Sequence, residues 1–365
     1  MEILPKGTNG LFLSVDEDRN IIFEKSAKHI DLKKLFDKHL FKSRRKVIVA
    51  ADPTLATTIP IPLELARDEG TKKKERIALP ELENLIAQAM AKIFNGCRTE
   101  AAKRLGIHEL DTILVGLKAK NFKVDGKAVV SPVGFAGKKI TLFLEMTFTT
   151  RAIFEDLKYF FNSPEEFFFA EAPQALLSSL SRVRKPPLSL VVVNNGGTTL
   201  YVLEKPKDEY PVLYREKLGW AFGSFFRKIT EELGVSEKVA RDLYKKHLDG
   251  DMSEHVKKAV KKAIQPALDA FWEEIGKGKL RGFAYIDAQS AMPFALPHRH
   301  GPATFEKHPV GDILAQLGFS ADPGVADGDR NATLRATLYF LEAYFDKSNS
   351  DVNQKLRRRL HWLAE

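Results

Sequence analysis

Two stretches of this chain, residues 11–25 and 188–204, repeat one local pattern, in which two runs of strand-forming residues are joined by a short polar turn. In the second stretch, LSLVVVNNGGTTLYVLE, β-branched and aromatic residues flank Asn-Asn-Gly-Gly and predict a β-hairpin. Each unit leads into a region that mixes strand and helix patterns. A chain of 365 residues that starts the same pattern twice is expected to form two related α/β lobes.

Composition and charge limit the class of protein. Hydrophobic residues make up 44% of the chain, enough to bury a sizeable core, and the net charge is +9. That charge favours anionic partners, but no basic patch is interleaved with aromatic residues, so no nucleic-acid partner is predicted. The single cysteine, Cys97, cannot form an internal disulfide. With no secretory signal and no apolar run long enough to span a bilayer, the expected location is the cytoplasm.

The region between the two hairpins predicts a compact α+β unit at residues 80–162. Pro80 opens a helix that continues to about Leu105, and Asp125-Gly126 marks a hairpin between two strand patterns. Residues 53–80 are rich in proline and charge, and within them Arg67–Glu75 has the pattern of an exposed loop. Further patterns predict strands at 46–51, 113–124, 127–131, 138–148 and 282–287, and helices at 30–40, 150–161, 165–182, 219–275 and 331–345.

Three stretches resemble the FtsA/PilM family of actin-like bacterial proteins, which act in cell division and pilus assembly. They are SPVGFAGKKITLFLEMTF (131–148), VVVNNGGTTLYVL (191–203) and EKLGWAFGSFFRKITEELGVSEKVARDLYKKH (216–247). The resemblance implies an actin-like α/β fold with duplicated lobes of the ribonuclease H type and an inserted α+β subdomain in the first lobe. The segments expected on this basis are 1–79 and 163–187 for the first lobe, 80–162 for the inserted subdomain, 188–223 and 281–345 for the core of the second lobe, 224–280 for a helical subdomain, and 346–365 for a linker with a C-terminal helix.

The same resemblance implies a nucleotide site at the second hairpin. It assigns the second phosphate loop to Asn195, Gly196, Gly197, Thr198 and Thr199, with Gly219 following it, and ATP with Mg²⁺ as the ligand. Glycines can adopt the positive φ angles that a phosphate-binding turn needs, so we expect such angles at Gly196 and Gly197.

Departures from the family pattern predict that this site is degenerate. Where the family has carboxylates that place Mg²⁺, this chain has Val193 and Leu200. The first phosphate loop is replaced by Asp16–Asn20, whose three carboxylates would repel a polyphosphate. The adenine glycines are replaced by Ala288–Pro293, and Arg241 and Tyr244 stand near the ribose. We expect vestigial nucleotide binding or a purely structural hairpin, with no catalytic residues and no metal ligands.

The tail DVNQKLRRRLHWLAE (351–365) has the pattern of an amphipathic helix. Such a basic helix is typical of an interfacial membrane anchor, and FtsA carries its membrane-targeting helix at this place. The alternative is a terminal helix that packs on the body of the protein. The residues expected to contact the membrane are Val352, Leu356, Arg357, Arg358, Arg359, Leu360, Trp362 and Leu363.

These features give three functional hypotheses. The first is a scaffold that tethers an FtsZ-type polymer, with other division proteins, to the anionic inner face of the cell membrane. On that reading, residues 80–162 would serve self-association or recruitment. The second is a PilM-like adaptor that binds a peptide of a membrane-embedded pilus or secretion protein. The third, an active ATPase, is disfavoured by Val193 and Leu200.

Overall fold

The computed structural model describes residues 2–3, 9–15, 20–28, 47–67, 75–158, 167–205, 211–288, 292–293, 297, 299–306, 318, 320–321 and 351–363. The chain forms two units, one of Met1–Ser179 with Val310–Glu365 and the other of Leu180–Pro309. We call them unit 1 and unit 2. Three expected features lie outside the described residues: most of the first phosphate loop, the helix at 30–40 and the helix at 331–345.

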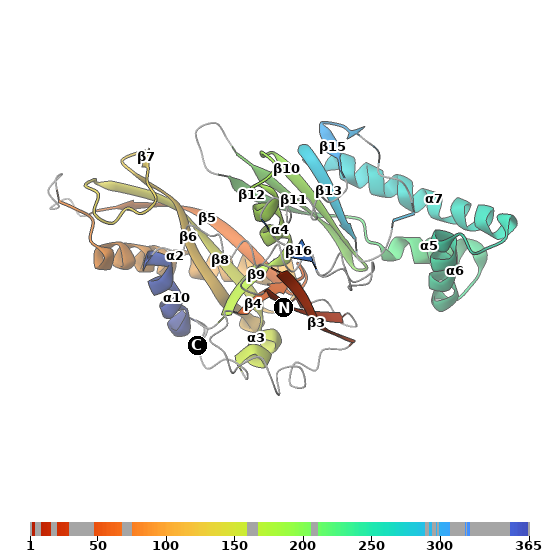
Figure 1. Ribbon diagram of the computed structural model, residues 1–365, viewed down its shortest axis with the longest axis horizontal. Coiled ribbons are helices and arrows are strands. Elements are labelled where there is room, and N and C mark those ends of the chain that lie inside the picture. Colours follow the sequence, from red (N-terminus) through yellow and green to blue (C-terminus); the bar gives the residue numbers. More distant parts are fainter. Residues whose placement is uncertain are drawn as a thin grey trace. The chain divides into compact units, whose positions relative to one another are not determined.

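Unit 1 contains a six-stranded sheet with the order β16-β3-β2-β1-β4-β9 (Figure 1). Strand β2 is antiparallel to β1 and β3, whereas β4 is parallel to β1 and β9 is parallel to β4. The strands are β1 (Glu2–Ile3), β2 (Asn9–Val15), β3 (Asn20–Lys28), β4 (Val47–Ala51), β9 (Phe167–Glu171) and β16 (Ser320–Ala321). The first hairpin that the sequence predicts is the pair β2–β3.

Unit 2 contains a second six-stranded sheet with the order β12-β11-β10-β13-β15-β14. Its first three strands form an antiparallel meander, β13 is parallel to β10, and β15 is parallel to β13. The strands are β10 (Leu188–Asn194), β11 (Gly197–Glu204), β12 (Val212–Leu218), β13 (Gly282–Ala288), β14 (Arg299–His300) and β15 (Ala303–Phe305). Five strands of each sheet share one order and one set of directions, which confirms the expected pair of related α/β lobes.

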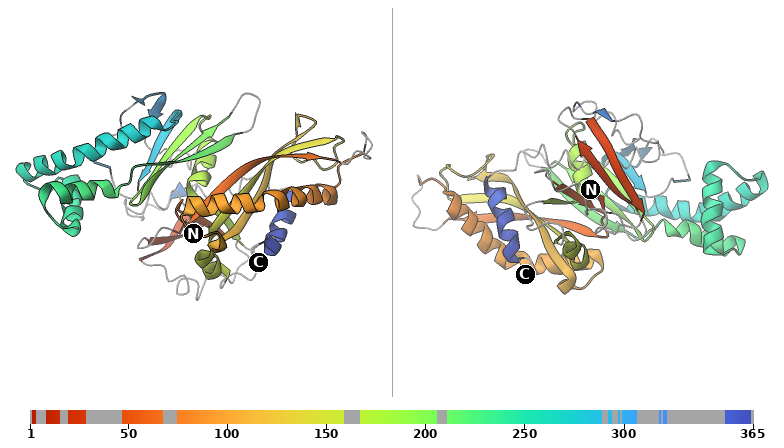
Figure 2. Two further views of the ribbon diagram at one scale, coloured as in Figure 1. Left: turned by 180° about the vertical axis from the view of Figure 1, so that it is seen from behind. Right: turned by 60° about the horizontal axis from the view of Figure 1, so that its bottom comes forward.

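A separate antiparallel sheet, with the order β5-β8-β6-β7, lies between β4 and β9 in the sequence. Helix α2 packs against its strands (Figure 2). Its elements are β5 (Ala56–Ala66), α2 (Leu79–Leu105), the 3-10 turn η1 (Glu109–Asp111), β6 (Thr112–Val124), β7 (Lys127–Ala128) and β8 (Lys139–Thr150), followed by helix α3 (Arg151–Lys158). Because β5 belongs to this sheet, the sheet begins well before residue 80.

Strand β5 lies in the proline- and charge-rich stretch of residues 53–80, where the sequence patterns predicted no strand. Its prolines sit where a strand tolerates them. The Thr58 N–H points away from β8 and donates to Glu171 Oε2 at 2.6 Å. Since N–H groups alternate along a strand, Pro60 and Pro62 fall on the same free edge as Thr58, where a missing N–H breaks no ladder bond.

The helix expected over residues 165–182 is partly wrong, because the segment begins as strand β9 and becomes helix α4 (Ala172–Leu180) only afterwards. The aromatic run Phe167–Phe169 pairs with Val47–Val49 of β4. Pairing with a neighbouring strand overrides the local helical pattern here, as aromatic side chains fit a pleated surface well.

Three helices extend unit 2: α5 (Gly223–Leu233), α6 (Glu237–Asp249) and α7 (Glu254–Lys277). The predicted break between the first two is confirmed, since Gly234 has φ +63° and the Ser236 hydroxyl accepts the Val239 N–H. Their shared core with the sheet is aromatic, with Trp220, Phe222, Phe225, Phe226, Tyr244 and Phe271 all buried.

The C-terminal helix α10 (Asp351–Leu363) packs against β6 and α2 of unit 1 (Figure 2). Val352 and Leu356 are each 1% exposed and lie in the hydrophobic core of the β5-β8-β6-β7 sheet. Two of the side chains expected to contact a membrane are therefore buried inside the protein. They could reach a bilayer only if α10 left the sheet. Among the described residues, no helix is both long and apolar enough to cross a membrane.

A polar contact fixes the position of α10. The Ala119 N–H donates to Asn353 Oδ1 at 2.7 Å, and Asn353 Nδ2 donates to the Ala119 carbonyl at 2.9 Å. The side-chain amide thus pairs with β6 as one residue of a neighbouring strand would. Lys355 adds an ion pair with Glu83 of α2 at 3.1 Å.

Candidate functional site

The second hairpin is built as its sequence predicts, with Asn195-Gly196 as a two-residue turn between β10 and β11. The register pairs Asn194 with Gly197 and Val191 with Leu200. Neither Gly196 nor Gly197 adopts a positive φ, however, so the backbone conformation that we expected for a phosphate-binding turn is absent from this hairpin. An anion-binding nest, in which successive backbone N–H groups converge on one anion, needs neighbouring residues that alternate between right-handed and left-handed conformations.

Neither of these two glycines is needed to avoid a steric clash, because each has room for a Cβ atom. A Cβ atom at Gly196 would meet nothing within 4 Å, and one at Gly197 would lie 3.7 Å from Lys217 Cε. We therefore expect Gly196→Ala and Gly197→Ala to change the free energy of unfolding by less than about 1 kcal/mol. Gly282→Ala is the contrasting variant, because its φ is +64° and a Cβ there would lie 2.0 Å from the Pro187 carbonyl oxygen.

Urea denaturation of the three variants checks this prediction. Gly282→Ala should cost more than about 2 kcal/mol, since both backbone strain and a backbone clash oppose it. A comparable loss for Gly196→Ala would show that the hairpin needs glycine for a reason that the geometry does not contain.

The N-terminus of α5 lies directly behind the hairpin. A helix N-terminus attracts anions because its first N–H groups lack partners within the helix. Here the Phe222 N–H donates to the Asn194 carbonyl at 3.0 Å, and the Gly223 N–H donates to the Asn195 carbonyl at 3.2 Å. The next two N–H groups, of Ser224 and Phe225, donate to the carbonyls of Ala221 and Phe222. These four N–H groups at the start of α5 therefore all have acceptors within the protein.

A glycine makes this contact possible. A Cβ atom at Gly223 would lie 3.1 Å from the Asn195 carbonyl oxygen, which is tighter than side chains ordinarily pack. Gly223, which the sequence analysis did not single out, therefore serves helix-to-hairpin packing.

The remaining predicted site residues are divided between surface and core. Asn195 and Gly196 are exposed, whereas Thr198 is fully buried opposite Val193 and Leu218. Within the described part of the chain, the Thr198 hydroxyl has no hydrogen-bond partner. Its burial in the β10–β11–β12 face keeps it from a ligand in solvent. Thr199 is half-buried.

Gly219 contacts α7 at a different point. Its N–H donates to Glu274 Oε2 at 2.8 Å, and a Cβ there would lie 2.9 Å from the same oxygen. The Lys277 ammonium and this N–H hold the pKa of Glu274 below its ordinary value. Gly219 therefore allows the end of β12 to pack closely against α7.

Positions that depart from the family pattern are structural. Val193 and Leu200 are buried in the core of unit 2. Tyr244 lies among Phe222, Phe225 and Phe226, and this burial raises the pKa of its hydroxyl. Arg241 stacks on Phe226 and pairs with Glu237 at 2.6 Å. The side chains of Val193 and Leu200 carry no oxygen that could hold Mg²⁺.

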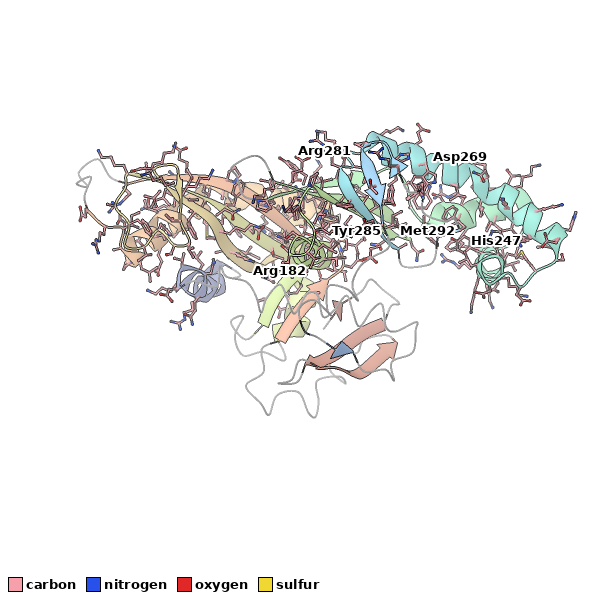
Figure 3. All side chains as sticks on the ribbon, turned by 45° about the horizontal axis from the view of Figure 1, so that its top comes forward. Arg182, His247, Asp269, Arg281, Tyr285 and Met292 are labelled. Atoms are coloured by element: carbon pink, nitrogen blue, oxygen red, sulfur yellow. The ribbon has the colours of Figure 1, made fainter. Side chains whose placement is uncertain are left out.

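Tyr285 and His247, two further titratable groups of unit 2, lie far from each other (Figure 3). Burial raises the pKa of Tyr285, on β13, to about 12. At the far end of the helices, burial together with Lys257 and Lys261 lowers the pKa of His247. No group of three or more potential metal ligands occurs among the residues that the structure describes.

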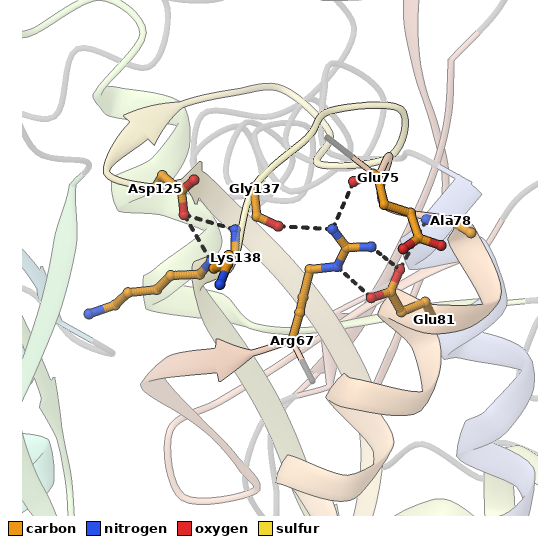
Figure 4. Close-up of polar contacts among 8 residues, drawn as sticks. Arg67, Glu75, Ala78, Glu81, Asp125, Gly137 and Lys138 are labelled. Atoms are coloured by element: carbon orange, nitrogen blue, oxygen red, sulfur yellow. Dashed lines mark hydrogen bonds and ion pairs between the residues drawn. The ribbon is translucent and has the colours of Figure 1, made fainter. Parts of the chain in front are cut away.

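One polar cluster was missed by sequence reasoning because Arg67 was expected in an exposed loop. Its side chain is only 2% exposed and forms a two-pronged ion pair with Glu81 of α2. It also donates to the carbonyls of Glu75 and Gly137, each at 2.9 Å (Figure 4). Arg67 thus joins the end of β5 to the start of α2 and to the loop before β8.

Comparison with known proteins yields no family assignment: no family model and no curated protein matches this chain. Among solved structures, a PilM-PilN type IV pilus biogenesis complex aligns over 93% of this chain and 96% of that one, with a TM-score of 0.45 and 12% identity. A glycerol dehydratase reactivase (TM-score 0.32, 14% identity) covers 68% of this chain and 48% of its own. A diol dehydratase-reactivating factor in nucleotide free form (TM-score 0.32, 17% identity) covers 73% and 49%. The assignment of two related lobes therefore rests on the strand order of the two six-stranded sheets.

Proposed function

We propose that this protein is an actin-like adaptor that binds another protein and does not hydrolyse nucleotide. The observation that carries the proposal is the contact between the hairpin and the start of α5. There the carbonyls of Asn194 and Asn195 accept hydrogen bonds from the N–H groups of Phe222 and Gly223. Phosphoryl transfer depends on donors and a metal ion placed around the phosphates. Opening this site would break two backbone hydrogen bonds.

Nucleotide titration tests the proposal. With 1 mM ATP and Mg²⁺, we expect no change in the thermal unfolding midpoint and no release of phosphate. A ligand whose Kd is about a hundredth of its concentration would add about 2.7 kcal/mol of stability, which a thermal shift detects readily. Sodium phosphate with Mg²⁺ is the matched control for ionic effects. A saturable rise in the midpoint with ATP alone would contradict the proposal.

The packing of α10 also bears on which partner is bound. It favours an adaptor that binds a peptide over a scaffold that tethers a division polymer to the membrane. The tether hypothesis needs the apolar face of α10 to enter the bilayer, but Val352 and Leu356 of that face are in the core. Under our proposal α10 is structural, and the ligand is a segment of a membrane-embedded pilus or secretion protein. Co-sedimentation with preassembled FtsZ-type filaments distinguishes the two, since the adaptor should stay in the supernatant.

A further inference from the structure

The loop between β7 and β8, residues 129–138, exposes two apolar side chains. Val130 is 82% exposed and Phe135 is 49% exposed. The other exposed large apolar side chains among the described residues are Leu110, Tyr214 and Val239, each on a different element. Exposing two such side chains in one short loop is unfavourable in water unless the loop has an apolar surface to contact.

Hydrogen bonds hold the turn that carries Phe135 in place. The Phe135 N–H donates to the Pro132 carbonyl at 3.1 Å across Gly134, whose φ of +86° suits a type II turn. The turn is then bound to the segment before α2, where the Gly134 N–H donates to the Ile77 carbonyl and the Ile77 N–H donates to the Phe135 carbonyl. The Pro-Val-Gly motif of the sequence thus builds a fixed loop that presents Phe135 outward.

Cationic side chains surround this loop. Arg76 pairs as a β-bridge with Ala136, and Lys127 and Lys138 stand at its two ends. All three are exposed, and in the part of the chain that the structure describes none of them forms an ion pair.

Two of the nearby acidic groups have partners of their own. The Asp125 carboxylate accepts the N–H groups of Lys138 and Lys139 at 3.0 and 2.9 Å, and Glu64 pairs with the Lys139 ammonium at 2.6 Å (Figure 4 shows Asp125 and Lys138). Glu75 is exposed, and three lysines, Lys72–Lys74, precede it in the sequence. The charge around the two apolar side chains is positive.

We propose that this loop is a membrane-contact site that binds the surface of an anionic bilayer. Val130 and Phe135 enter the boundary between headgroups and acyl chains, while Arg76, Lys127 and Lys138 contact anionic headgroups. A single aromatic ring between cations does not form the stacking platform that single-stranded nucleic acid needs. The contact does not involve α10, so it is compatible with the docked C-terminal helix.

Vesicle co-sedimentation tests the proposal with the full chain. Binding to vesicles that contain phosphatidylglycerol should exceed binding to pure phosphatidylcholine vesicles by about tenfold. The double variant Val130→Asp/Phe135→Asp should lose most of this binding. Leu110→Asp is the matched control, because Leu110 is 64% exposed on η1, outside the loop, and its replacement should leave binding unchanged. Circular dichroism confirms that each variant is folded.

Three outcomes would overturn the proposal. If the double variant binds as well as the parent chain, another surface makes the contact. If a chain that ends at Ser350 loses binding to the same extent, α10 is the anchor. If the full chain binds neither kind of vesicle, the loop serves a protein partner instead.

A site-specific probe gives an independent readout. The only native cysteine, Cys97, is buried, so Val130→Cys can be labelled selectively with an environment-sensitive fluorophore such as NBD. We expect its emission to rise and shift to the blue with anionic vesicles. The same label at Leu110→Cys should not respond, and equal responses at both positions would overturn the assignment of the contact to this loop.

Discussion

Replacing Arg67 with methionine is expected to destabilise the protein by about 1–3 kcal/mol, because the buried guanidinium is the hydrogen-bond donor to two backbone carbonyls and to Glu81, whose side chain is 30% exposed. The variant leaves the Glu81 carboxylate without its guanidinium and the carbonyls of Glu75 and Gly137 without a donor. Urea denaturation followed by circular dichroism measures the loss. Arg104→Met is the matched control, since Arg104 pairs with Glu100 within one helix at a more exposed site and should cost less than about 1 kcal/mol.

The same ion pair predicts a dependence of stability on pH. Arg67 holds the pKa of Glu81 below its ordinary value of 4.5. A depressed pKa in the folded state stabilises the protein above pH 4.5, and this contribution disappears as the pH falls through the lower folded value. Between pH 7 and pH 3 the parent chain should therefore lose more stability than Arg67→Met. Equal slopes for the two proteins would show that the pair contributes no net stability.

Replacing Asn353 with leucine is expected to release α10 from the sheet. The variant removes both partners of Ala119, whose N–H and carbonyl would be left at the edge of β6. Burying two unpaired backbone groups costs about 2–6 kcal/mol in total, so undocking is the less costly response. Hydrogen exchange at the Ala119 amide should accelerate by at least about tenfold if opening becomes easier by 1.4 kcal/mol or more.

The neighbouring residue supplies the control for this variant. Gln354 is exposed on the same helix turn, so Gln354→Leu should leave the exchange rate of Ala119 unchanged. If Asn353→Leu also left it unchanged, Val352 and Leu356 would suffice to hold the helix, and the amide pairing would be incidental.

Local patterns predicted most of the strands and helices, and they failed where contacts distant in the sequence decide the structure. The hairpin at Asn195-Gly196 and the Ser236 cap follow from short-range turn and capping chemistry, so both could be predicted. Strand β5 could not, because Pro60 and Pro62 are normal breakers and only pairing with β8 shows that their missing N–H groups lie on a free edge.

The candidate site shows the same division. Its sequence predicts a glycine-rich turn followed by a helix, and both are present. The sequence does not predict the distance between the hairpin and the helix. That distance decides which carbonyls accept hydrogen bonds from the N–H groups of Phe222 and Gly223. For the tail, the amphipathic pattern of α10 fits a membrane and a protein core equally well, since both bury an apolar face.

The bond between Ala119 and Asn353 also sets an order of events during synthesis. The two residues are 234 positions apart, so β6 leaves the ribosome long before the helix that covers its edge. Synthesis proceeds at about 5–20 residues per second, so the edge of β6 stays uncovered for roughly 12–47 s until Asn353 is made. An uncovered strand edge is a template for pairing with other chains. Nascent chains of this protein should therefore depend on chaperones until α10 has been made, and chains that stop before α10 should aggregate.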